Sequence, residues 1–195
     1  MGKFADAATE YKAAIEAEPT SPTNSSKAAR LLKCKMETGD FEGAEEYVSL
    51  VDAGGLRDSF RALKLAQDGE TEEALSTLEH FLNEMPNDMT ANITNAQILA
   101  KLDSKERAVA GLTMLREPAS YMTRSLEMFE SVAKLGAIAE RPELAITAQK
   151  NADQLRDLEA QFAAKLGEVI KTRDNAQSRM ELGDLAAAAG NPEVA

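Results

Sequence analysis

The chain has 195 residues, with 33 acidic and 22 basic side chains, a single cysteine and a formal net charge of -11. This acidic surplus disfavours a nucleic-acid partner, because duplex binding depends on clustered Lys and Arg side chains that replace counterions on the phosphates. Basic peptides or basic protein faces match the charge better, although an acidic surplus also keeps an exposed helical surface soluble. The lone Cys34 excludes an intramolecular disulfide and no segment is apolar enough to cross a bilayer, so we expect a cytoplasmic protein without membrane insertion.

Helices are predicted along the whole chain. No run of residues alternates apolar and polar types with a period of two, so we expect no strands and an all-α fold. Polar capping of the second helix is expected from Thr23 or Asn24, and Pro142 and Asn191-Pro192 read as helix starts. The expected helices span residues 3–17, 24–38, 41–52, 56–68, 71–84, 88–101, 104–116, 120–139, 142–171 and 174–189.

A short pattern recurs along these helices. It opens the chain as Gly2, Phe4, Ala7, Tyr11, Ala14 and Pro19, and it returns with the same offsets as Gly69, Thr71, Ala74, Leu78, Phe81 and Pro86. Its turn position falls at Gly2, Gly39, Gly69, Asp103, Glu140 and Gly190, and a small or aliphatic residue lies seven positions before each later turn, at Leu32, Ala62, Ala96, Ala133 and Gly183. Each unit therefore consists of two helices, and a repeat of this length predicts stacked units that present a surface for binding rather than for catalysis.

The pattern resembles the tetratricopeptide repeat, whose signature places a Leu-Gly pair and a Tyr on the first helix, then Ala, an aromatic residue and a closing Pro on the second. Residues 180–186 match the first half of that signature and Gly2 to Pro19 match the second half. The resemblance implies one alpha-alpha solenoid, or superhelix, of antiparallel helix pairs over residues 1–195. Its repeat units lie near residues 1–20, 22–54, 55–87, 88–118, 120–172, which is irregular, and 174–195, which is partial. Small side chains at Ala7, Ala44, Ala74, Ala108 and Ala145 are expected to let paired helices approach closely.

The stretch after Pro142 departs from the repeat pattern. Apolar residues fall there at alternating spacings of three and four, which predicts a heptad seam along one long C-terminal helix. We expect this helix either to fold back on the preceding helices as a cap or to pair with another chain. The charge of Glu159, in the middle of the seam, counts against a regular coiled coil. The seam comprises Ala145, Ala148, Ala152, Leu155, Glu159, Phe162, Leu166 and Val169.

Residues suited to catalysis or metal binding are not expected to converge. Cys34 and His80 fall in different units without an orienting third group, so we expect Cys34 to be a buried small side chain and His80 to face solvent. One histidine and one cysteine do not make a transition-metal site without carboxylate ligands, and no such convergence is evident. Acidic pairs such as Glu45-Glu46 are typical of solvated helix starts. The sequence therefore predicts no catalytic residue, no cofactor and no metal.

The resemblance also implies where a partner would bind. In tetratricopeptide arrays the first helix of each unit lines a concave groove that holds an extended peptide or a partner helix. For Phe60 and Leu63 the alternative is burial in the core between units. The asparagine and lysine pattern with which chaperone-adaptor members grip a C-terminal carboxylate is not reproduced. Carried onto this chain, the groove comprises Arg30, Lys33, Phe60, Leu63, Gln67, Thr94, Gln97, Lys101, Glu130 and Lys134.

Three functions stay open on the sequence alone. The leading hypothesis is a non-catalytic scaffold that binds a protein or peptide partner along its concave face. The alternatives are a regulatory or substrate-recruiting arm of a larger enzyme, and a homo-oligomeric assembly module such as a homodimer. The chain begins and stops inside repeat units, from which we expect it to be a fragment of a larger protein.

Overall fold

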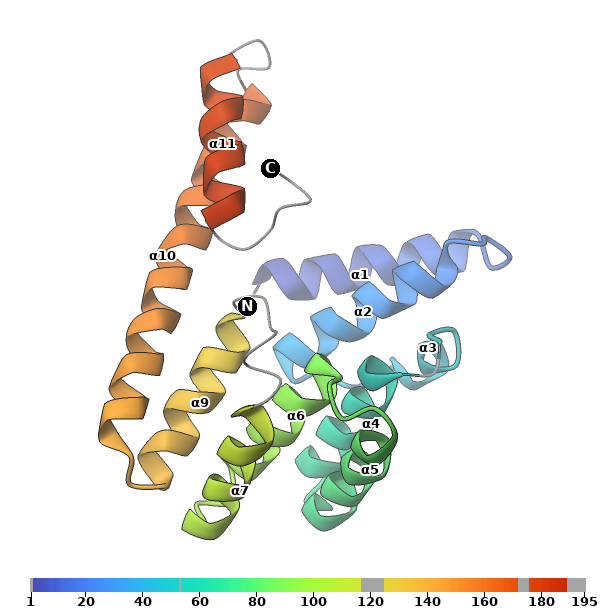
Figure 1. Cartoon of the computed structure of the whole chain (residues 1–195). Coiled ribbons are helices and arrows are strands. Elements are labelled where there is room, and N and C mark those ends of the chain that lie inside the picture. Colours follow the sequence, from blue (N-terminus) through green and yellow to red (C-terminus); the bar gives the residue numbers. More distant parts are fainter. Residues whose placement is uncertain (1, 53, 117–124, 172–175, 189–195) are drawn as a thin grey trace. The chain divides into compact units, whose positions relative to one another are not determined.

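A computed structural model of the chain describes residues 2–52, 54–116, 125–171 and 176–188. All regular elements in these residues are helices, which confirms the predicted all-α class (Figure 1). The chain divides into two compact units, Met1–Ile98 and Leu99–Ala195. Within the described ranges, no helix has a stretch both long and apolar enough to span a bilayer.

The first unit is built from helices that pack on their neighbours in the chain. Helix α1 packs on α2, α4 packs on α5, and α2 also contacts α3 and α4. Apart from α3, the helix ends agree with the predicted ends to within two residues. The helices are α1 (Gly2–Ala17), α2 (Asn24–Thr38), α3 (Glu45–Val48), α4 (Gly55–Gln67), α5 (Thr71–Glu84) and α6 (Met89–Leu99), whose last residue belongs to the second unit.

The helix predicted over residues 41–52 is wrong, because only the single turn α3 forms there. Gly43 adopts a left-handed backbone with φ of 65°, which a helix does not accommodate, so α3 begins only after it, at Glu45. At the equivalent place in the next unit stands Glu73, which lies within α5. The turn α3 is tied to α1 instead, where the Tyr47 hydroxyl donates a 3.0 Å hydrogen bond to Glu16 Oε1.

The expected cap of α2 is also corrected. Thr23 occupies the N-cap position, but its side chain makes no capping hydrogen bond. The buried side chain of Asn24 instead reaches back over the preceding turn, where its Nδ2 donates to the carbonyls of Glu18 at 2.8 Å and Pro19 at 3.0 Å. Asn24 therefore stabilises the turn that joins α1 to α2.

The second unit is organised around one long helix. Helix α9 (Leu126–Ile138) packs on α7 (Lys105–Arg116) and on α10 (Pro142–Lys171), and α11 (Ala176–Ala188) packs on α10. Pro142 is the first residue of α10, as predicted. The seam on α10 is buried in its first half, at Ala148, Ala152 and Leu155. Its first half thus takes the fold-back arrangement that the heptad spacing allowed.

Four of the six predicted turn positions share an unusual backbone conformation, whereas Gly2 is the first residue of helix α1. Gly39 and Gly69 have φ of 65° and 91°, and Asp103 and Glu140 have φ of 46° and 57°. In the described part of the chain these last two are the only residues other than glycine with positive φ. The left-handed region is unfavourable for side-chain-bearing residues, so this coincidence supports the register of the repeat. Gly190 lies outside the described residues, as does the Asn191-Pro192 pair.

Small residues recur at fixed distances from these turns. Five positions after a turn, Ala44, Ala74 and Ala108 are fully buried, while Ala145 is half-buried. At Gly136, which faces Ala145, an added Cβ would lie 3.1 Å from the Ala145 nitrogen, so α9 and α10 approach closely at this point. Ala44, Ala74 and Ala108 are thus buried, as the predicted packing role requires, and a close approach of two helices is seen at Ala145.

Candidate interaction surface

Cys34 and His80 lie as predicted, with the cysteine buried on α2 and the histidine exposed on α5. Burial, with a smaller effect from Glu37, raises the pKa of the Cys34 thiol, so its reactive thiolate is disfavoured. Among the described residues, no group of three or more His, Cys, Asp or Glu side chains is arranged to hold a metal ion.

The predicted groove residues divide into an exposed set and a buried set. Phe60 on α4 is 1% exposed and forms an edge-to-face pair with Phe41, with ring centroids 5.2 Å apart, so it belongs to the core. Leu63 is buried in the same core. The exposed members are Arg30, Lys33 and Gln67 in the first unit and Lys101 and Lys134 in the second.

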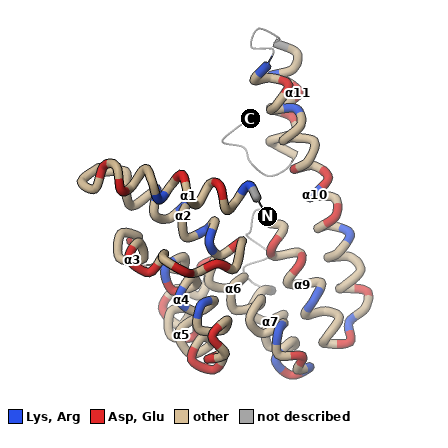
Figure 2. Tube along the Cα trace, turned by 180° about the vertical axis from the view of Figure 1, so that it is seen from behind, with Lys and Arg blue, Asp and Glu red and all other residues tan. Residues whose placement is uncertain are grey.

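Helix α6 corrects the groove prediction further. It carries no charged residue, as Figure 2 also shows, and the residues from Ala91 to Ala96 are all buried. Thr94 is therefore inside the protein, and Gln97 is half-buried. Neither side chain offers the open helix face that the resemblance implied.

On α2, Arg30 extends towards α1 and donates from its guanidinium to the Tyr11 hydroxyl at 3.3 Å. Lys33, one turn further on, is exposed. This end of the predicted groove thus presents two cations on the outer side of one helix.

A hollow in the first unit lies where α2 and α4 end. It is a shallow depression that includes Gln67 from the predicted groove and the ring of Phe41. We call it the acidic depression, since its lining carries four carboxylates and one ammonium group. Its lining residues are Gly39, Asp40, Phe41, Glu42, Glu45, Lys64, Gln67 and Asp68.

Two helix ends add to the negative field of the acidic depression. Gly39 is the C-cap residue of α2 and Asp68 that of α4, and a helix C-terminus carries a partial negative charge from its unpaired carbonyls. Lys64 lies between Asp68, at 3.1 Å, and Glu45, at 3.6 Å. The hydrogen bond with Asp68 is the main reason why the pKa of Lys64 is raised.

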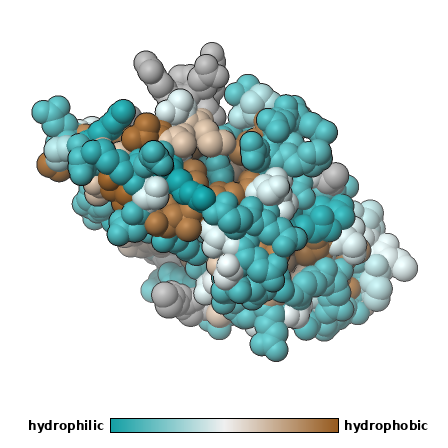
Figure 3. Space-filling model, turned by 90° about the horizontal axis from the view of Figure 1, so that it is seen from below, coloured by the Kyte–Doolittle hydropathy of each residue, from teal (hydrophilic) through white to brown (hydrophobic). Residues whose placement is uncertain are grey.

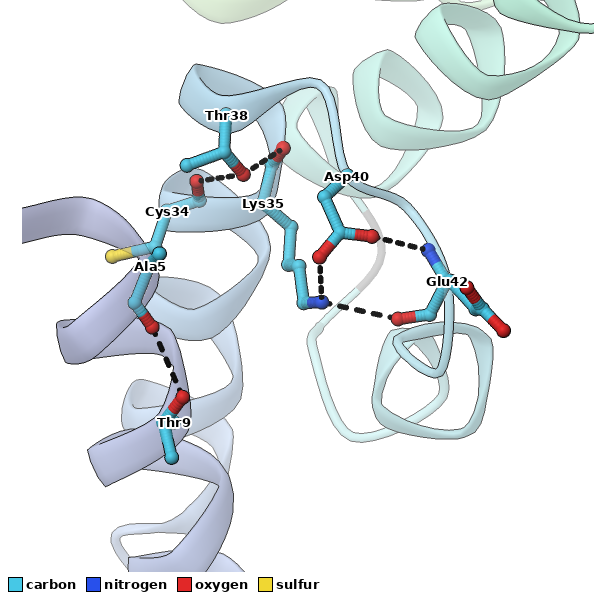
Figure 4. A network of polar contacts seen from close by, with 7 residues as sticks. All are labelled: Ala5, Thr9, Cys34, Lys35, Thr38, Asp40 and Glu42. Atoms are coloured by element: carbon cyan, nitrogen blue, oxygen red, sulfur yellow. Dashed lines mark hydrogen bonds and ion pairs between the residues drawn. The ribbon is translucent and has the colours of Figure 1, made fainter. Parts of the chain in front are cut away.

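A second lysine holds the rim of the depression (Figure 4). Lys35 Nζ donates to Asp40 Oδ2 at 2.7 Å and to the Glu42 carbonyl at 3.1 Å, while Asp40 Oδ1 accepts from the Glu42 amide at 3.2 Å. The hydrogen bond from Lys35 lowers the pKa of Asp40. The loop after α2 is thus fixed in place, with the Glu42 side chain left at the exposed edge.

The hollow described in the second unit is smaller than the acidic depression. A small hollow beside α9 and α10 is lined by Phe129, Asn151, Gln154, Leu155 and Leu158. Glu130, one of the predicted groove residues, is instead engaged by Arg156, which also bonds Asp153 at 2.6 Å. The face drawn in Figure 3 is mostly hydrophilic, with hydrophobic groups showing between the hydrophilic ones.

Sequence reasoning missed the acidic depression, although one signal was available. Asp40, Glu42 and Glu45 cluster around a turn glycine, and such a run could have been read as a loop rim rather than as the start of a helix. Asp68 and Lys64 are remote from that loop in sequence, so their approach needed the packing of α2 on α4.

No family model, no curated protein and no solved structure matches this chain. The resemblance to tetratricopeptide repeats therefore rests on the residues of the chain itself.

Proposed function

We propose that this chain is a non-catalytic protein-binding module built from repeated helix pairs of the tetratricopeptide type. The observation that carries the proposal is the recurrence of a left-handed turn at residues 39, 69, 103 and 140, with a small residue five positions after each. Stacked helix pairs extend a surface along the array instead of enclosing one central cavity, and such surfaces serve recognition.

The contact we favour on the first unit is the acidic depression. Its carboxylates outnumber its ammonium groups, and both helix ends that border it are electronegative. A peptide segment that carries Lys or Arg side chains complements this charge, as expected for an acidic protein. The rim is already fixed by Lys35, so binding there does not require the loop to be ordered first.

The proposal is tested by selection from a phage-displayed library of random peptides on the immobilised full chain. We expect enrichment of basic peptides that bind the wild-type chain and bind the Glu42→Lys variant less tightly. Glu42→Lys reverses the charge of an exposed side chain on the rim, and Glu79→Lys makes the same change at an exposed site on α5 as a control. Enriched peptides without basic residues, or equal loss in both variants, would contradict the assignment to the depression.

A further inference from the structure

Asp68 and Gly69 form the only pair in the chain in which a glycine follows an aspartate or an asparagine. The pair lies at the end of α4, where Asp68 is the C-cap residue and Gly69 turns the chain with φ of 91°. In such a pair the backbone nitrogen of the glycine can attack the side-chain carboxyl group that precedes it, because the glycine carries no side chain that would hinder the approach.

The attacking nitrogen is free in the folded protein. The amides on either side of it are bonded to α4, from Asp68 to the Lys64 carbonyl at 2.9 Å and from Glu70 to the Leu65 carbonyl at 2.9 Å. The Gly69 amide between them donates no hydrogen bond to any residue in the described part of the chain. An added Cβ at Gly69 would meet no atom within 4 Å, so the space beside this nitrogen is open.

The carboxylate of Asp68 is within reach of solvent, with 51% of the side chain exposed. Lys64, one turn earlier on α4, lies with its Nζ at 3.1 Å from Asp68 Oδ2. An ion pair between partly exposed side chains four residues apart is weak, because water screens it. Lys64 therefore restrains the Asp68 side chain without locking it in place.

Ring closure also needs a backbone rotation, and the end of α4 can make it. In the folded chain the ψ angle of Asp68 is -2°, and the attack requires this bond to turn until the glycine nitrogen lies beside the side chain. Residues 67–70 are all exposed, so the rotation opens the end of the helix without uncovering the core. The last turn of a helix opens more readily than its middle.

We propose that Asp68 is a site of spontaneous isomerisation, at which the main chain is rerouted through the aspartate side chain. The Gly69 nitrogen attacks Cγ of the protonated carboxyl group, an N–Cγ bond forms, and the Cγ–OH bond breaks, so that the hydroxyl leaves as water with the amide proton. The product is a five-membered succinimide ring. Water then adds to the backbone carbonyl carbon of Asp68 and breaks its bond to the nitrogen, which leaves an isoaspartate. One water is lost and one is gained, so no oxidant and no further reactant is required.

Isomerisation alters the acidic depression, which Asp68 lines. An isoaspartate adds one carbon atom to the main chain and carries its carboxylate on Cα, so the carboxylate leaves its place beside Lys64. Lys64 keeps its second partner, Glu45, at 3.6 Å. The isomerised chain should therefore bind basic peptides less tightly. The isomerisation itself does not depend on the peptide binding proposed above, so each can fail alone.

The test keeps the purified full chain at neutral pH and body temperature for several weeks and locates isoaspartate by peptide mapping with mass spectrometry. Two aspartates are internal controls. Asp40 is also paired with a lysine but is followed by Phe41, and Asp103 lies at the equivalent turn but is followed by Ser104. We expect isoaspartate at Asp68 at a level several-fold above that at either control. A level at Asp68 no higher than at the controls would overturn the proposal.

Three variants test the roles of the neighbouring groups. Gly69→Ala places a methyl group beside the attacking nitrogen and should reduce isoaspartate at residue 68 several-fold, whereas Lys64→Met removes the restraint and should increase it. Circular dichroism at the start of each incubation checks that the variants are folded. Asp68→Asn keeps the same backbone and releases ammonia in place of water, so it should form isoaspartate faster than wild type. Equal accumulation in wild type and Gly69→Ala, or no faster reaction in Asp68→Asn, would contradict the assignment.

Discussion

The ring of Phe60 meets the edge of Phe41 and is almost fully removed from solvent. Truncation to alanine would remove this pair and leave a cavity between α2, α4 and the loop after α2. We expect Phe60→Ala to lower the free energy of unfolding by about 3–5 kcal/mol. Urea unfolding followed by circular dichroism measures it. Lys33→Glu, at an exposed site on α2, is the control and should change stability by less than about 0.5 kcal/mol. Similar losses in both variants would show that Phe60 is not core.

Tyr47 gives a pH-dependent test of the contact between α3 and α1. Burial, with the nearby Glu16 carboxylate, raises the pKa of Tyr47 to about 12. An unfolded tyrosine ionises near pH 10, so the stabilisation from this shift is complete below about pH 10 and is lost as the pH rises towards the folded value. The ultraviolet difference titration of wild type against Tyr47→Phe should show a midpoint near 12.

The control for this titration is the same pair of proteins in urea, where the midpoint should fall to about 10. Circular dichroism must show that the native sample is still folded at each pH. A midpoint near 10 in the folded protein would mean that Tyr47 is solvated and that α3 does not pack on α1 as described.

At the scale of elements, the turns between helices test the register of the repeat. Gly69 and Asp103 hold equivalent positions with left-handed backbones. Gly69→Ala should destabilise the protein by about 1 kcal/mol through the backbone alone, because an added Cβ meets no atom within 4 Å. Asp103→Gly should have the opposite sign, with a gain of up to about 1 kcal/mol. Thermal unfolding measures both, and equal signs would refute the equivalence of the two turns.

At the start of α4, Gly55 lies against the side chain of Asp88, a contact that no sequence pattern predicted. An added Cβ at Gly55 would lie 1.9 Å from Asp88 Oδ1, and this oxygen accepts from the Ala91 amide at 2.9 Å in the first turn of α6. Gly55→Ala must displace that carboxylate, so we expect a loss of about 1–3 kcal/mol. Gly54→Ala is a matched control with open space around its Cβ. In an Asp88→Ala background the Gly55→Ala penalty should largely disappear, and its persistence would contradict this explanation.

The helices could be predicted from the sequence because their breaks carry Pro, Gly and polar residues at clear positions, as at Pro19, Pro86 and Pro142. The short α3 could not, since Gly43 sits inside an otherwise helical pattern and its left-handed backbone prevents a helix from running on from residue 41. Asn24 and Asn92 illustrate a second limit. Each is buried and its Nδ2 bonds carbonyls of the preceding turn, a role that the sequence does not announce; for Asn24 it predicted ordinary polar capping instead.

The surface was harder to predict than the helices. A resemblance to a repeat assigns one helix of each unit to a groove, but it does not say which side chains of that helix point outward. Phe60 and Leu63 were therefore predicted to line the groove, with burial as the alternative, and they pack in the core. Helix α6 has no charged residue to mark a solvent side, so Thr94 and Gln97 were assigned by position alone. The acidic depression required the spatial approach of the loop after α2 to the end of α4, which local patterns do not encode.

At the scale of the whole molecule, the account rests on binding to a protein partner. The direct measurement is affinity capture from a lysate of the source organism on three immobilised full chains, wild type, Glu42→Lys and Glu79→Lys, with quantitative mass spectrometry. We expect at least one protein to be enriched on the wild-type and Glu79→Lys chains and depleted on the Glu42→Lys chain. A basic peptide from that protein should bind purified wild type and Glu79→Lys more tightly than Glu42→Lys. The same set of proteins on all three chains, or none above an empty support, would contradict the account.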